Sequence, residues 1–150
     1  MADVAASVLA KLRNKAKAAG ISYQQCLQLF VQEDFLGRLS KSGYEDHLGL
    51  KGGLFMYTLT NFESRATIDA DFLLRGFSNS IADVKELIKK IIDTPTGNDY
   101  IEMSARGYEE ISPQRKYQGI SAQIMSQIKN VRVPFNVDIV YFPFLFLLYF

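Results

Sequence analysis

Apolar side chains recur at helical spacing in three segments of the chain. The spacing predicts helices over residues 3–19, 22–39 and 80–94. Ser22 and Gln25 form a capping-box sequence at the start of the second segment. The signals that end these helices are Gly20, Gly43, Pro95 and Gly97.

The remaining apolar runs favour β-strands. Strands are predicted over residues 67–74, 100–105, 119–128 and 131–141, with a tight hairpin at Lys129-Asn130 between the last two. Helices alternating with strands over 150 residues predict one α/β (α+β) domain.

Two aspartates lie in the first of these strands. Asp69 and Asp71 are two residues apart, so their carboxylates share one face of a strand, about 6 to 7 Å from each other. Phe72 and Leu74 then face the core. Such a carboxylate pair can hold a hard cation, and Mg²⁺ prefers oxygen ligands. The alternative is an ordinary polar face on an amphipathic edge strand.

A double glycine precedes this strand. Lys51, Gly52 and Gly53 follow a short apolar run and precede a helix-compatible segment, residues 54–59. Glycines at such a junction let backbone N–H groups approach a phosphate at the positive end of a helix. The alternatives are a plain tight turn and a solvated lysine.

Together these residues resemble a known family. Gly52-Gly53 followed by Arg65-x-Thr67-x-Asp69-x-Asp71 looks like the signature of the polymerase-β-like nucleotidyltransferases, and within them of the AbiEii-type toxins. The resemblance implies a mixed β-sheet flanked by helices. It also implies a third carboxylate on a nearby strand, for which Asp138 is the candidate. Without the resemblance, Asp138 reads as an exposed strand residue.

The resemblance carries a function with it. It implies transfer of a nucleotide from a nucleoside triphosphate to an RNA (including tRNA) or protein acceptor. Asp69, Asp71 and Asp138 would be the catalytic residues and the ligands of Mg²⁺ or Mn²⁺. The nucleotide phosphates would contact Gly52-Gly53, Lys51, Arg65 and Thr67. An antitoxin protein is the implied partner.

The end of the chain departs from that family. We expect a nucleotidyltransferase core over residues 1–138 and an atypical apolar tail over residues 139–150, which has no charged residue. The helical C-terminal half that the resemblance implies does not follow. Truncation or a shifted reading frame is one interpretation of the tail, and a hydrophobic docking segment is the other. A catalytically idle remnant that only binds a partner such as an antitoxin is therefore the alternative function.

Composition and charge exclude several other classes of protein and kinds of site. The formal net charge is +1, which argues against a dedicated nucleic-acid-binding domain. One cysteine, Cys26, excludes an internal disulfide and fits a reducing cytoplasm. One cysteine and one histidine are too few for a structural zinc site.

The tail is interrupted by Pro143 and is shorter than the ~20 apolar residues of a membrane span, and no secretory leader precedes the first helix. We expect a cytoplasmic protein that does not enter the membrane.

Overall fold

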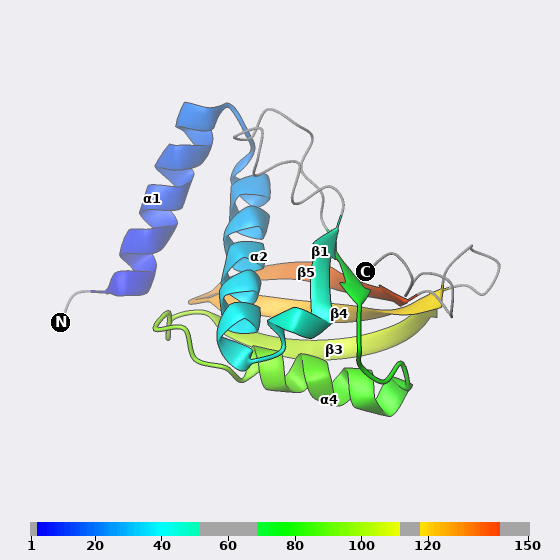
Figure 1. Cartoon of the computed structure of the whole chain (residues 1–150). Coiled ribbons are helices and arrows are strands. Elements are labelled where there is room, and N and C mark those ends of the chain that lie inside the picture. Colours follow the sequence, from blue (N-terminus) through cyan, green and yellow to red (C-terminus); the bar gives the residue numbers. More distant parts are fainter. Residues whose placement is uncertain (1–2, 52–68, 112–117, 142–150) are drawn as a thin grey trace.

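The computed structural model describes residues 3–51, 69–111 and 118–141. At positions 50, 51, 69–71 and 118 it describes the backbone and not the side chains. Within these ranges the chain forms three α-helices, a short 3-10 helix and one five-stranded mixed sheet (Figure 1). The predicted α+β class and mixed sheet are confirmed. The elements are α1 (Val4–Ala19), α2 (Tyr23–Ser42), η1 (Glu45–His47), β1 (Leu48–Lys51), β2 (Asp69–Leu74), α4 (Ile81–Ile92), β3 (Glu102–Ile111), β4 (Gln118–Ile128) and β5 (Val131–Tyr141).

The helices begin and end where local signals predict. At the start of α2, Ser22 Oγ accepts a hydrogen bond from the Gln25 backbone N–H at 3.0 Å, and Gln25 Oε1 accepts one from the Ser22 N–H at 3.3 Å. At the start of α4, Ser80 Oγ accepts a hydrogen bond from the Asp83 backbone N–H at 3.2 Å. Gly20 takes a left-handed conformation that ends α1. Each of these boundaries is set within a few residues of sequence.

The strands show two differences from prediction. The strand predicted over residues 100–105 is β3, which continues to Ile111 because a β-bulge absorbs one extra residue between Ala105 and Gly107. β1 was not predicted, since it has only four residues and includes Gly49. Strands β4 and β5 and the Lys129-Asn130 turn agree with the sequence, and Lys129 has the positive φ of a tight turn (53°).

The strand order is β1-β2-β5-β4-β3. β2 pairs with β5 in parallel and with β1 antiparallel, while the other pairs are antiparallel. β2 is therefore an inner strand and not the edge strand of the alternative interpretation, while an ordinary polar face at Asp69 and Asp71 stays a prediction.

One face of the sheet carries the hydrophobic core. Alternate residues of β5 are buried on it, namely Val133, Phe135, Val137 and Ile139. Phe35 of α2 contacts Phe135 and Phe72 of β2, with ring centroids 5.9 and 5.8 Å away. Helices α2 and α4 contact each other and the sheet, while α1 packs against α2 (Figure 1). The opposite face carries the other set of alternate residues, which includes Asp138.

The residues predicted to begin an apolar tail belong in part to the sheet. β5 continues through Tyr141, and Ile139 is buried in the core. Residues 142–150 lie outside the described ranges, so the two interpretations of the tail stay predictions. None of the helices in the described ranges is long and apolar enough to cross a bilayer.

Candidate functional site

The sheet register brings three predicted site residues into one row. Asp71 of β2 is the direct partner of Asp138 on β5, and Lys51 of β1 is the partner of Asp71 on its other side. Asp69 pairs with Asn136 one step along the same two strands. Neighbouring strands lie about 4.8 Å apart, so positions 51, 71 and 138 are consecutive across three strands.

The row continues across the rest of the sheet. Ser121 of β4 is the antiparallel partner of Asp138, and Glu109 of β3 is the partner of Ser121. Ser121 lies on the face opposite the helices, because its sequence neighbours Ile120 and Ala122 are buried in the core, and its register partners Asp138 and Glu109 share that face. We call positions 51, 71, 138, 121 and 109 the transverse row.

Asp138 is half-buried and hydrogen-bonded. Its Oδ1 accepts a hydrogen bond from Ser121 Oγ at 2.6 Å, a length typical of a hydroxyl donating to a carboxylate. The interpretation of Asp138 as an exposed strand residue therefore does not describe it.

Ser121 was not among the residues predicted for the site. No motif marks it, but the hairpin could have revealed it. A two-residue turn at Lys129-Asn130 pairs Ile128 with Val131, and counting outward along both strands pairs Ser121 with Asp138.

Close backbone packing holds β4 against β5 beside this pair. A side chain at Gly119 would place its Cβ 2.5 Å from the carbonyl oxygen of Ile139 and 2.8 Å from Cδ1 of Ile111. Only glycine fits there, two residues from Ser121. The close approach of β4 to β5 at this position therefore requires glycine.

Other predicted site residues lie outside the described ranges: Gly52, Gly53, Arg65 and Thr67. Among the side chains that the structure describes, no group of three or more His, Cys, Asp or Glu could hold a metal ion. The side chains of Asp69 and Asp71 are not in that set, so the three-aspartate metal site stays a prediction.

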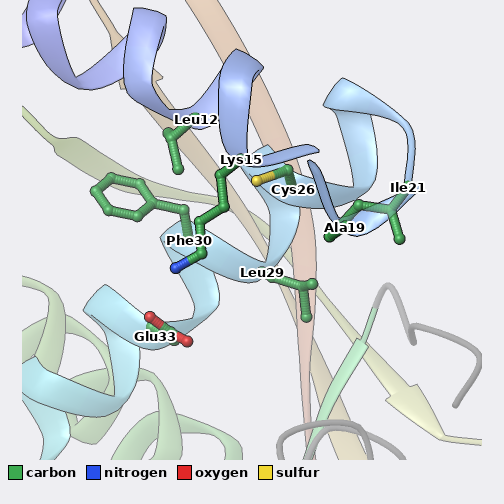
Figure 2. A pocket seen from close by; sticks show the side chains of 8 residues that line it. All are labelled: Leu12, Lys15, Ala19, Ile21, Cys26, Leu29, Phe30 and Glu33. Atoms are coloured by element: carbon green, nitrogen blue, oxygen red, sulfur yellow. The ribbon is translucent and has the colours of Figure 1, made fainter. Parts of the chain in front are cut away.

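A hollow elsewhere in the molecule is too small for a nucleotide. It has a volume of about 40 Å³ and lies between α1 and α2, where Cys26, Lys15 and Glu33 are among its lining residues (Figure 2). This is room for one or two water molecules. Burial raises the pKa of the Cys26 thiol, with Lys15 acting in the opposite direction. A buried protonated thiol is a poor nucleophile, so this hollow has no evident chemistry.

Comparison with known protein families gives a match over most of the chain. The family model described as the nucleotidyl transferase AbiEii toxin of type IV toxin–antitoxin systems matches residues 34–146, well over half of the chain. The chain belongs to the AbiEii family. No curated protein and no solved structure matches it.

The AbiEii match spans all of the sheet and its row of polar positions. It begins inside α2 at Asp34, so α1 and the first half of α2, including Cys26, precede it. The part of the chain that this toxin family shares thus contains both the predicted carboxylates and Ser121. The family is described as one of nucleotidyl transferases and toxins.

Proposed function

We propose that this AbiEii family member is a metal-dependent nucleotidyltransferase whose site is the Asp69, Asp71 and Asp138 end of the sheet. The observation that carries the proposal is the parallel pairing of β2 with β5, which makes Asp71 and Asp138 direct partners. The two aspartates are far apart in sequence and adjacent in the sheet.

The charges of the paired aspartates favour a bound cation. Like charges at directly opposed positions of neighbouring strands destabilise a sheet, and Asp69 adds a third carboxylate one alternate position away. A divalent cation would turn this repulsion into attraction. Aspartate oxygens are the hard donors that Mg²⁺ and Mn²⁺ accept, so this donor set fits the metal.

Each residue then has a defined part. Asp69, Asp71 and Asp138 would hold the metal, which when bound stabilises charge on the oxygens of an in-line phosphoryl displacement. Lys51, next to Asp71 in the transverse row, would contact a phosphate as a point charge. Gly52-Gly53, Arg65 and Thr67 would contact the phosphates as the sequence predicts. Asp138 would also accept the proton of the acceptor hydroxyl.

The substrates follow from the reaction class. We infer a nucleoside triphosphate as donor, an RNA or protein hydroxyl as acceptor, and pyrophosphate as the second product. As a member of a toxin family, the chain would be restrained by an antitoxin protein.

The test combines binding and transfer. The chain is incubated with Mg²⁺ or Mn²⁺, each labelled nucleoside triphosphate in turn, and a mixture of total RNA and proteins. We expect label transfer that Asp71→Asn and Asp138→Asn abolish. Asp99→Asn, which changes an exposed aspartate before β3, should leave transfer unchanged. Nucleotide binding without label transfer would favour the catalytically idle alternative. The absence of both nucleotide binding and label transfer would refute the proposal.

A further inference from the structure

We propose that Ser121 is a positioning residue that orients the Asp138 carboxylate toward the bound cation. The inference rests on the proposed function and assigns a role to a residue outside the predicted site. Ser121 and Asp138 are register partners, and the hydroxyl donates to Oδ1 at 2.6 Å.

The side chain of Ser121 is not part of the hydrophobic core. Ile120 and Ala122 on either side are almost completely buried against the helices, while Ser121 is half-buried on the other face. Within the described part of the chain, the hydrogen bond that its side chain makes is the one to Asp138. A serine in the middle of an eleven-residue strand lacks the β-branched or aromatic side chain that strands favour. The hydrogen bond gives this position a reason for a hydroxyl.

A single donated hydrogen bond also controls geometry. A carboxylate has two oxygens, and fixing Oδ1 limits rotation of the group about its terminal torsion. Under the proposal, Oδ2 is the oxygen that would contact the cation, because the hydroxyl of Ser121 donates to Oδ1. Groups that hydrogen-bond to metal-ligating carboxylates in this way raise metal affinity, and their loss typically weakens it about 10- to 100-fold.

The backbone supports the same arrangement. Gly119 keeps β4 in close contact with β5, because any larger residue would collide with the carbonyl oxygen of Ile139. On the other side of Asp138, β2 places position 71 at the same register level. Ser121 on β4 thus holds Asp138 from one side, while the other predicted metal ligands, Asp69 and Asp71, lie on β2 at the other side.

The test compares two variants of equal shape. Ser121→Thr keeps a hydroxyl and Ser121→Val replaces it with a methyl group, and both residues suit a strand. Binding of Mn²⁺, alone and with inorganic tripolyphosphate, is measured from the paramagnetic resonance signal of free Mn²⁺. We expect Ser121→Val to weaken binding by about 10-fold or more. Ser121→Thr should keep most of the affinity, and thermal unfolding should show both variants folded.

Control variants distinguish the role of Ser121 from the proposed function on which it rests. Ser104→Ala removes an exposed serine of the same sheet and should leave Mn²⁺ affinity unchanged. If Asp138→Asn weakens binding while Ser121→Val matches Ser121→Thr, Ser121 has no positioning role and the proposed function still stands. If the unmodified chain binds no Mn²⁺, both the proposed function and the role of Ser121 are refuted.

Discussion

Arg38 donates from Nε to the Asp34 carboxylate at 2.8 Å, and both side chains are almost fully buried. The guanidinium also donates to the carbonyl oxygens of Ile92 and Ile101, at the ends of the α4 and pre-β3 segments. The other oxygen of Asp34 accepts from Asn98 Nδ2 at 3.0 Å and from the Thr96 hydroxyl. One ion pair on α2 therefore bonds two backbone carbonyls and two side chains of the α4–β3 connection.

Removing the cation from this pair should be costly. Arg38→Met leaves Asp34 as a buried charge without its counter-ion, and we expect a loss of about 3 to 5 kcal/mol in the free energy of unfolding. Urea denaturation measures it. The control is Lys90→Met, which breaks the solvent-exposed pair with Glu86 and should change stability by less than about 1 kcal/mol. Equal losses in both variants would contradict the structural role of Arg38.

The paired carboxylates make a prediction about stability without metal. Asp71→Asn removes one of two like charges at register partners, so in the presence of a chelator it should stabilise the fold by about 0.2 to 1 kcal/mol. With Mn²⁺ and a nucleoside triphosphate, the unmodified chain should gain stability by mass action and the variant should not. Thermal unfolding under both conditions tests this. A variant that is less stable without metal would count against repulsion between these positions.

Two glycines should respond to alanine in opposite directions. Gly119→Ala forces a Cβ against backbone atoms of β5, and we expect a loss of about 1 to 3 kcal/mol. Gly37 lies inside α2, where a Cβ meets only Thr96 at an ordinary 3.8 Å. Gly37→Ala should therefore stabilise the fold by about 0.5 to 1 kcal/mol, because glycine is a poor helix former. Denaturant unfolding of both variants decides whether the close approach at Gly119 is real.

Cys26 gives a prediction about pH. Burial raises the pKa of its thiol above that of the unfolded chain. The stability linked to this group is therefore fully present below the unfolded pKa and declines as pH rises through the folded value. We expect Cys26→Ala to lose less stability than the unmodified chain between neutral and alkaline pH. A thiol reagent should react slowly with the folded chain and quickly in urea, and rapid reaction in the folded state would contradict the burial of Cys26.

The sequence predicted those features that depend on neighbours along the chain. The capping box at Ser22 and Gln25 and the strand over residues 131–141 depend on local sequence, and both are found where predicted. The bulge near Arg106 was missed because charged residues and a glycine interrupt the apolar pattern of β3.

The transverse row depends on pairing between distant strands. Asp69 and Asp71 could be selected from their spacing, and Asp138 through the family resemblance, but the register that makes them neighbours could not be predicted. That Lys51 pairs with Asp71, and Asp71 with Asp138, follows from the insertion of β5 beside β2, which no local pattern specifies. Within the row, only the pairing of Ser121 with Asp138 could be predicted from the sequence, because the length of the hairpin turn sets the register of β4 and β5.

The parallel pairing of β2 with β5 also orders events during synthesis. Asp71 leaves the ribosome early, but its partner on β5 emerges only after α4, β3 and β4 have been made. Under the proposed function, a partly made chain that ends before β5 lacks Asp138 and would not form the complete carboxylate site. Toxicity would begin only when the last described strand enters the middle of the sheet.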